Sequence, residues 1–353
     1  MVEHRPSKPR VAGSSPVSRS YNVLYITEAK PEDLDSLQDI CRYSFEFSMY
    51  RVDRKLLNLI GTDDLSLVSR NIISSSTDTL IAVNKGKILG FLSWNYEKSL
   101  SSITHRQIYK INLIAVSKDY RGQGIGSELL KYFINSSLKR GAQIVTVSTD
   151  ENNIGAINFY SKHNFQYSSN FLTLRLFKSN YNSDLPKHRE EINISVAKSK
   201  EEIHQFIYQN DEYTNYPFPI LFEREIEEKI KSNVLDNYLR SLELNFDMFN
   251  ILMANIDKKP VGYIVVKDDV NLSLVLSKIS SKMIKVYRIF DIFVMKDFRG
   301  KGIGKYLIYS AINTIKDFDF VEIQIPSHNY PLINALVSNN FCISHSMVNL
   351  FRR

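Results

Sequence analysis

The sequence predicts an α/β protein built from two tandem repeats, on three observations. The stretch Asn112 to Leu130 recurs at Phe290 to Ile308, with an apolar strand, a short polar turn and Arg-Gly-x-Gly-Ile-Gly in each copy. Apolar residues follow the last glycine of both copies at helical spacing. The two copies lie one domain length apart, so the internal repeat divides the 353 residues in two.

The composition is that of a soluble globular chain, with 43% hydrophobic and 24% charged residues. Cys41 and Cys342 lie far apart and give neither a disulfide framework nor the spacing of a metal site. No apolar run approaches the roughly 18 residues of a membrane span. The first residues lack the apolar core of a secretory signal. A cytoplasmic protein without a metal or a membrane partner is therefore expected.

The formal charge is +7, and part of it comes from residues 1–20, where four basic residues face one acidic residue. These twenty residues lack periodicity and are predicted to be a disordered tail. The rest of the chain shows no basic stripe interleaved with aromatic residues, as nucleic-acid modules do. A nucleic-acid partner is therefore not expected, since only the charge of the tail favours one.

Repeat one is predicted over residues 21–178, with its elements in the following order. They are a strand at 22–27, helical segments from Pro31 to about Ser75, a hairpin at 80–96, the loop-bearing strand at 107–116, a helix to Lys139, a strand at 143–148 and a short helix at 153–163. Phe165–Tyr167 and Phe171–Phe177 are predicted to close the repeat as a second hairpin. Residues 179–191 are predicted to be a linker, because they are polar and carry little apolar content.

Repeat two is predicted over residues 192–353 in a similar order. It has a strand at 192–197, a helix opened by a capping box of Ser199 and Glu202, a helical stretch at 222–242, a hairpin at 249–267, the loop-bearing strand at 285–294, a helix at 302–315, a strand at 320–325, a helix at 331–337 and closing strands at 341–351. Residues 269–282 are predicted to be an insertion without a clear counterpart in repeat one.

The glycines of the two loops favour phosphate binding. Glycines at alternate positions let backbone N–H groups converge before a helix N-terminus, which is a nest for phosphate oxygens. Two known phosphate motifs are excluded. The Rossmann pattern requires a glycine or alanine where Ser127 and Lys305 stand, and neither copy ends in the Gly-Lys-Ser/Thr of a P-loop.

What remains is the pattern Arg-x-x-Gly-x-Gly, at Arg121, Gly124 and Gly126 and again at Arg299, Gly302 and Gly304. It resembles the pyrophosphate-binding loop of the GNAT superfamily of acetyl-CoA-dependent N-acetyltransferases. The resemblance covers almost the whole chain after residue 20. It implies two tandem GNAT-like domains, each a mixed, mostly antiparallel sheet flanked by helices. It also implies acetyl-CoA as the cofactor, a small-molecule or peptide amine as the acceptor, and direct transfer in a ternary complex.

The resemblance further implies which residues contact the cofactor: the end of the loop-bearing strand, the loop, and an asparagine that begins a later helix. In repeat one these are Ile114, Ala115, Val116, Arg121, Gly122, Gln123, Gly124, Ile125, Gly126, Ser127 and Asn153. In repeat two they are Ile292, Phe293, Val294, Arg299, Gly300, Lys301, Gly302, Ile303, Gly304 and Asn329. A buried central strand explains the strand residues equally well.

Tyr160 is the predicted general acid that protonates the departing thiolate. It lies seven residues after Asn153 and five before Phe165, which is similar to the family's second motif. The alternative is a core aromatic. Leu336 stands at the matching position of repeat two and cannot donate a proton. Repeat two is therefore predicted to be a degenerate partner that completes the substrate cleft.

The general base is not evident from the sequence. Where many family members carry Glu, this chain has Lys110 and Arg288, which are not bases at neutral pH. Glu97 is the predicted proton relay, with His105 and Asp291 as alternatives, and each also fits an ordinary surface residue. The missing base and the missing second tyrosine favour a competing hypothesis, a non-catalytic acyl-CoA-binding sensor or scaffold. The sequence identifies neither the acceptor nor the oligomeric state.

Overall fold

The computed structural model describes residues 24–42, 44, 53–61, 72–74, 78–182, 191–209 and 246–353. The predicted tail at 1–20 lies outside the described residues, as do residues 183–190 of the predicted linker and the predicted helix at 222–242. In the part of the chain that the structure describes, no helix is long and apolar enough to cross a membrane.

The main elements of repeat one are β1 (Tyr25–Glu28), α1 (Leu34–Arg42), α3 (Arg54–Ile60), β2 (Asp78–Asn84), β3 (Lys87–Tyr96), α5 (Lys98–Thr104), β4 (Ile108–Val116), α6 (Ile125–Lys139), β5 (Ile144–Asp150), α7 (Ile154–Lys162) and β6 (Gln166–Phe177). Those of repeat two are β7 (Asn193–Val196), α8 (Lys200–Gln209), β8 (Phe249–Ile256), β9 (Lys259–Asp268), α10 (Val270–Ser280), β10 (Val286–Val294), α11 (Ile303–Thr314), β11 (Phe320–Pro326), α12 (Tyr330–Val337) and β12 (Cys342–Arg352).

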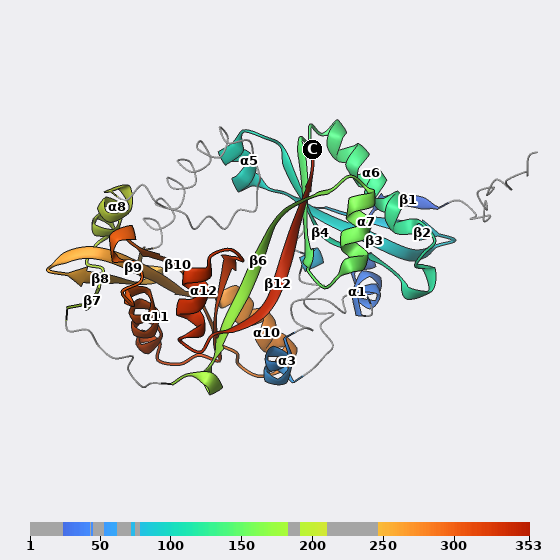
Figure 1. Cartoon of the computed structure of the whole chain (residues 1–353). Helices are drawn as coiled ribbons and strands as arrows, with labels where there is room; N and C mark the ends of the chain where they lie inside the picture. The colour runs from blue at the N-terminus through green and yellow to red at the C-terminus, as the bar shows by residue number, and fades with distance from the viewer. Residues whose placement is uncertain are drawn as a thin grey trace, which may run out of the picture.

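The described strands form one sheet in the order β1-β2-β3-β4-β5-β12-β6-β11-β10-β9-β8-β7 (Figure 1). Only β4 with β5 and β10 with β11 pair in parallel, so the sheet is mixed and mostly antiparallel, as expected. The order from β1 to β5 is repeated from β7 to β11, which shows the internal repeat in three dimensions. The predicted two sheets are joined into one through β12 and β6.

Each repeat contributes a strand to the other half of the sheet. β6 pairs with β11 of repeat two over Phe171–Phe177, and β12 pairs with β5 of repeat one over Met347–Arg352. The two exchanged strands also pair with each other. Leu174 of β6 therefore belongs to the core under α11, and Leu350 of β12 belongs to the core under α6.

The predicted closing hairpin of repeat one is wrong. Residues 166–177 form one continuous strand of 12 residues, and residues 342–352 form one of 11. The physical reason is that β12 offers β6 a partner on one side along almost its whole length, with the irregularity near Ser168 taken up as a bulge. A turn at that point would have broken these backbone hydrogen bonds.

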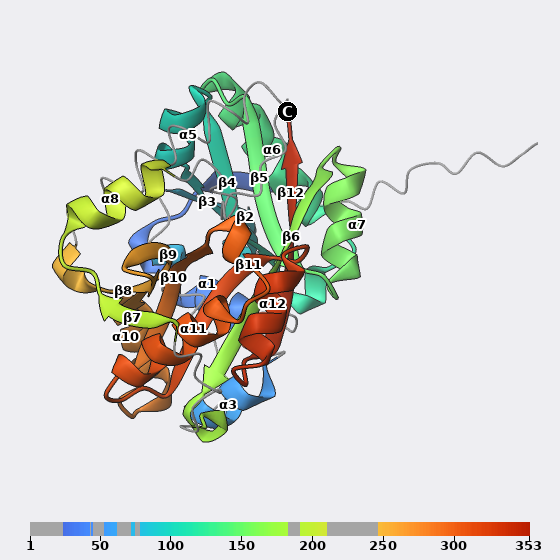
Figure 2. The same cartoon turned by 60° about the vertical axis from the view of Figure 1, so that its left-hand side comes forward.

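Helices cover both faces of the sheet (Figure 2). On face A, α6 and α7 pack on the core of repeat one, and α11 and α12 pack on that of repeat two. The opposite face, face B, packs against α1 through Cys41, against α3 and α10 through Leu56 and Leu276, and against α8 through Phe206. α3 of repeat one and α10 of repeat two thus share one apolar cluster.

The predicted insertion at 269–282 does have a counterpart. It forms α10, which lies between β9 and β10 as α5 lies between β3 and β4. The residue before each helix also makes the same backbone hydrogen bond to the next strand. Glu97 N–H donates to Ile108 O at 2.9 Å, and Asp269 N–H donates to Val286 O at 2.8 Å. The correspondence is hard to recognise in the sequence because α5 has only 7 residues whereas α10 has 11.

Candidate functional site

Strands β4 and β5 separate partway along their length. They pair in parallel only from Ile108 with Ile144 to Ile111 with Val147. Asn112 is then an extra residue between the β3–β4 pairs of Ile111 and Leu113, which is a β-bulge. Beyond it, β4 keeps β3 as a neighbour, and no strand in the described part of the chain pairs with it on the β5 side. That edge can therefore offer backbone groups to a ligand.

The pairing shows which backbone groups face this open edge. Ser117 donates its N–H to Leu89 O at 2.8 Å, and hydrogen-bonded pairs alternate with non-bonded pairs along an antiparallel ladder. Ile114 and Val116 therefore direct their N–H and C=O groups away from β3, towards the gap. Those of Ala115 face Phe91 on β3 instead. Of the three predicted strand residues, Ile114 and Val116 have backbone groups on this edge, and the Val116 carbonyl already accepts from Arg121 Nε.

Repeat two has the same geometry. β10 and β11 pair only from Val286 to Arg288, and Phe290 is the bulge residue. Met295 donates to Val261 O at 2.9 Å, so the same alternation turns the backbone groups of Ile292 and Val294 away from β9. There the Ile292 N–H donates to Asp291 Oδ1 at 2.8 Å. Phe293 pairs with Tyr263 on β9.

The loops have the conformation that their glycines predict. Gly122 and Gly124 have φ of 72° and 87°, and Gly300 and Gly302 have φ of 75° and 83°, values that side chains rarely tolerate. Gly124 and Gly302 are the N-cap residues of α6 and α11. The N–H groups of the first turn, including those of Ile125, Gly126, Ser127, Ile303 and Gly304, have no acceptor within the helix and are available to an anion.

The loop arginines are held against the strands that precede them. Arg121 Nε donates to Val116 O at 3.1 Å, and Arg299 Nε donates to Val294 O at 2.9 Å. The side chains between the glycines turn back on the loop. Gln123 donates to Asp119 O at 3.2 Å, and the Lys301 ammonium lies 4.9 Å from the centre of the Phe298 ring. Backbone groups, rather than these side chains, form the anion nest.

A cavity of about 460 Å³ opens beside the loop of repeat two. It lies between the end of β10, the start of α11, and α12. Its lining includes predicted residues from the strand, the loop and the helix start, namely Ile292, Phe293, Val294, Arg299, Gly300, Gly302, Ile303, Gly304 and Asn329. The volume falls in the range of small-molecule sites. Repeat two, predicted to be degenerate, thus keeps the space for a ligand.

Tyr160 is almost completely buried in α7, with its ring centre 5.3 Å from those of Phe159 and Phe165. Burial raises the pKa of its hydroxyl above the ordinary value of 10.0. The group therefore keeps its proton at neutral pH, which is the form that a general acid requires. Leu336 occupies the matching position of α12 and is fully buried.

Asn153 and Asn329 are N-caps. The side-chain oxygen of Asn153 accepts from Ala156 N–H at 3.1 Å, and that of Asn329 accepts from Leu332 N–H at 3.4 Å. The two residues have nearly the same backbone angles. Asparagine before a helix is a strong capping signal, so this role could have been predicted from the sequence.

The polar residues proposed for proton relay lie in different places. Glu97 follows β3 opposite Ile108, about 13 Å along β4 from the bulge at roughly 3.3 Å per residue. Asp291 is buried on face B, where it accepts from the Tyr263 hydroxyl at 2.5 Å. His105 ends α5 in a left-handed conformation. Lys110 lies opposite Asn95 on β3.

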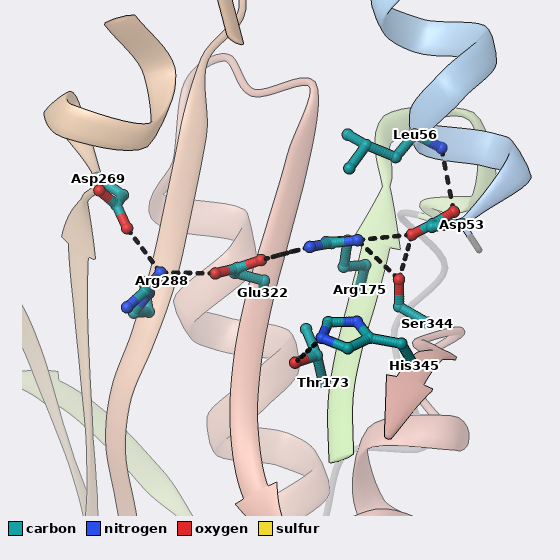
Figure 3. Close-up of polar contacts among 9 residues, drawn as sticks. All are labelled: Asp53, Leu56, Thr173, Arg175, Asp269, Arg288, Glu322, Ser344 and His345. Carbon is teal, nitrogen blue, oxygen red and sulfur yellow. Dashed lines mark hydrogen bonds and ion pairs between the residues drawn. The ribbon is translucent and has the colours of Figure 1, made fainter. Parts of the chain in front are cut away.

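Arg288 belongs to a row of charges, three buried and two partly exposed, that crosses the sheet (Figure 3). Its guanidinium contacts Asp269 at 2.9 Å and Glu322 at 2.6 Å. Glu322 also pairs with Arg175 at 3.1 Å, and Arg175 pairs with Asp53 at 2.7 Å. Five charges of alternating sign thus link α10, β10, β11, β6 and the N-cap of α3. Arg288 thus forms part of an ion-pair network within the sheet.

Sequence reasoning missed Asp150, at the end of β5 beyond the separation from β4. It is 3% exposed, and one carboxylate oxygen accepts from the N–H and the side chain of Asn152 at 2.9 and 3.1 Å. The other oxygen is buried and has no hydrogen-bond partner among the residues that the structure describes. The signal for the turn was the Asp-x-Asn spacing before a helix. No local signal marks the unpartnered oxygen.

The chain matches the acetyltransferase (GNAT) family over residues 41–165 and 208–337, one match in each repeat. It is 37% identical over 81 residues to an uncharacterized N-acetyltransferase of Methanocaldococcus jannaschii, and 33% identical over 84 residues to N-alpha-acetyltransferase MAK3 of Arabidopsis thaliana. These matches cover 23% and 22% of this chain. The chain spans only 35% and 44% of the length of these two relatives.

Two solved structures resemble the whole chain. A GCN5-related N-acetyltransferase from Sphaerobacter thermophilus has a TM-score of 0.58 at 12% identity, with 93% of this chain and 95% of that chain covered. A tandem GNAT protein from the clavulanic acid biosynthesis pathway has a TM-score of 0.55, also at 12% identity, with 94% and 98% covered. At such identity these likenesses concern the fold alone.

Proposed function

Because this chain belongs to the acetyltransferase (GNAT) family, we propose that it transfers an acetyl group from acetyl-CoA to an amine, and that repeat one carries the reaction. The observation that carries the proposal is the alignment of three parts in repeat one. They are the open edge of β4, the glycine nest that begins at Arg121, and Tyr160 on the helix that follows β5.

In this proposal the nest holds the diphosphate of the cofactor, and the backbone of Ile114 and Val116 pairs with the pantetheine arm. A backbone N–H on the same edge stabilises the oxyanion that forms when the amine attacks the thioester carbonyl. The carbon–sulfur bond then breaks, and the buried hydroxyl of Tyr160 gives its proton to the departing thiolate. The place of Tyr160 on the helix that follows β5 supports this assignment.

Two carboxylates are candidate bases for the incoming amine, Glu97 and Asp150. Asp150→Asn is a clean test because the amide oxygen can still accept from Asn152, so the turn is kept and only the charge is lost. If Asp150 is the base, kcat falls about 10²-fold or more and the acidic limb of the pH–rate profile disappears. Glu97→Gln is the matched variant, and loss of that limb in Glu97→Gln alone would identify Glu97 instead.

The acceptor is proposed to bind on face B, where the exchanged strands meet repeat one. There the Ser148 hydroxyl donates to Asn349 Oδ1 at 2.6 Å, and Asn349 Nδ2 donates to Ser169 at 3.3 Å. This half-buried polar row joins β5, β12 and β6, so it combines both repeats. The Arabidopsis relative is named for acetylation of an α-amino group, so peptides with a free α-amine are the first acceptors to screen.

The test of the proposed function is release of thiol from acetyl-CoA in the presence of a panel of peptide, sugar and small-molecule amines. Release that depends on one amine class supports transfer. The second candidate is an acyl-CoA-binding sensor, which Leu336 and the intact cavity of repeat two favour. Tight binding of acetyl-CoA without release by any amine would overturn the transferase in favour of the sensor.

A further inference from the structure

A side-chain contact ties the C-terminal end of α7 to the first turn of α6. His163 caps α7, and its Nε2 lies 3.0 Å from the hydroxyl oxygen of Ser127. The imidazole also packs at 4.9 Å from the ring centre of Phe159, and Arg352 of β12 donates to the backbone carbonyl of His163 at 2.9 Å.

Repeat two builds the same tie from different residues. Asn339 follows Leu336 by three positions, as His163 follows Tyr160, and Lys305 follows the last loop glycine, as Ser127 does. Asn339 Nδ2 donates to the backbone carbonyl of Lys305 at 3.2 Å. The tie therefore has a use that does not depend on histidine, but repeat one makes it with a side chain that titrates near neutral pH.

The position of the contact relates it to the anion nest. Ser127 belongs to the first turn of α6, where the N–H groups have no intrahelical acceptor, so its contact with His163 is made by a residue of the nest itself. The charged groups that face His163 are Lys131 and Glu128 of α6, which pair at 3.0 Å, and Arg352 of β12. Burial, followed by Lys131 and Arg352, lowers the pKa of His163 in the ligand-free protein.

We propose that His163 is a cofactor-positioning residue of repeat one, and that it takes up a proton when the diphosphate of coenzyme A enters the nest. The proposal rests on the proposed function. The proton comes from solvent and adds to Nε2. The imidazolium then donates to the Ser127 oxygen, which frees the Ser127 hydroxyl hydrogen to turn towards a phosphate oxygen. No covalent bond changes. The diphosphate supplies the negative charge that stabilises the imidazolium.

The affinity for the diphosphate depends on pH because ligand binding and protonation of His163 are coupled. A ligand that raises the pKa of a group binds more tightly to its protonated form, and the effect is reciprocal. Affinity for the diphosphate should therefore rise as the pH falls through the bound-state pKa of His163, and level off below its free-state pKa. A pKa difference of one unit between the two states corresponds to about a tenfold change in affinity.

The probe for the test is dephospho-CoA, because the 3′-phosphate of coenzyme A would itself titrate near pH 6. The protein is the full chain carrying Gly302→Asp, which removes the nest of repeat two. Calorimetry at pH 6.5 in two buffers of different ionisation enthalpy counts the protons taken up on binding. We expect a measurable fraction of one proton, and about tenfold tighter binding at pH 5.5 than at pH 8.

The matched control is His163→Asn, which copies the tie that Asn339 makes. In this variant we expect dephospho-CoA to bind with no proton uptake and with an affinity that changes less than about twofold over the same pH range. His163→Ala should weaken binding at every pH, because the tie itself is lost. A purely structural role would make all three proteins equally insensitive to pH.

The outcomes separate this inference from the proposed function. Equal proton uptake in the parent and in His163→Asn, or none in a parent that binds dephospho-CoA, would overturn the role of His163 and leave the transferase standing. No binding of dephospho-CoA to the Gly302→Asp protein, with binding retained in the unmodified chain, would place the cofactor in repeat two and overturn both.

Discussion

At the residue scale, repeat one has a proton donor at Tyr160, whereas repeat two has Leu336 at the matching position. Tyr160→Phe keeps the ring contacts with Phe159 and Phe165 and removes only the proton donor. We expect kcat to fall about 10²–10⁴-fold, the usual contribution of a general acid. The dissociation constant of acetyl-CoA should stay nearly unchanged. Thiol release and calorimetry on the same preparation measure both quantities, and an unchanged kcat would mean that the thiolate leaves without Tyr160.

Anion binding by the loop of repeat one can be tested with two substitutions of Gly124 that differ mainly in charge. Asp and Asn both tolerate the left-handed backbone of Gly124 better than other side chains, and open space surrounds the position where a Cβ would lie. We expect Gly124→Asp to weaken binding of acetyl-CoA to repeat one by about 10- to 100-fold, the equivalent of one lost charged hydrogen bond. Gly124→Asn is the control and should retain most of the affinity.

Gly302→Asp makes the matched change in repeat two. We expect it to lower the number of acetyl-CoA molecules bound per chain and to leave turnover nearly unchanged. Loss of turnover in Gly302→Asp, with activity retained in Tyr160→Phe, would assign the reaction to repeat two, where Asp291 is the buried carboxylate beside the bulge.

These residue-scale features could be predicted from the sequence because their determinants are local. The turns require a positive φ at Gly124 and Gly302, and glycine is the residue that adopts it most easily. The glycines in the sequence therefore predict this conformation directly. The roles of Asp150 and His163 could not be predicted. The contacts of His163 depend on Ser127 and Arg352, which the chain brings close only on folding. The turn at Asp150 is local, but its burial depends on how the sheet packs.

At the scale of elements, the row of charges in Figure 3 joins β6 to β11 and to the start of α3. Arg175 is fully buried, and it pairs with Glu322 of β11 and Asp53 before α3. Arg175→Met would leave the buried Asp53 without its cation and would leave Glu322 with Arg288 alone. We expect a loss of about 3–5 kcal/mol in the free energy of unfolding, measured by urea denaturation with an unchanged m-value.

Lys178→Met is the control, because Lys178 lies just beyond the same strand. Its side chain is 63% exposed, and its partner Asp317 is 51% exposed. Removing such a surface pair should cost less than about 1 kcal/mol. If both variants lost the same small amount, the charge row would contribute no more than an exposed ion pair.

The sequence did not predict the extent of elements that are stabilised by partners far along the chain. The continuous form of β6 is stabilised by β12, and β-strand preferences depend strongly on such partners. The short helix α5 was missed because Ser-rich turns rarely show an apolar stripe over 7 residues. The helices after the two loops were predicted within a few residues, since their apolar spacing and glycine caps lie within the elements themselves.

At the scale of the whole molecule, the exchanged strands make the two cores interdependent. Val348 and Leu350 are buried under α6 and α7, although they belong to repeat two. We expect a chain that ends before Cys342 to lose the cooperative unfolding transition of both repeats, because β5 and β6 would each lose a neighbouring strand. Circular dichroism during heating measures this, and a truncated protein with one unchanged transition would contradict it.

Because β5 and β12 are neighbours in the sheet but far apart in the sequence, they are synthesised at different times. β5 emerges from the ribosome more than a whole repeat before β12, its neighbour in the finished sheet. At about 5–20 residues per second, the edge of β5 stays without that partner for on the order of ten seconds or longer. An unpaired edge is a template for pairing with other chains. Translation speed and chaperone access in that interval would then decide how much of each nascent chain reaches the native sheet.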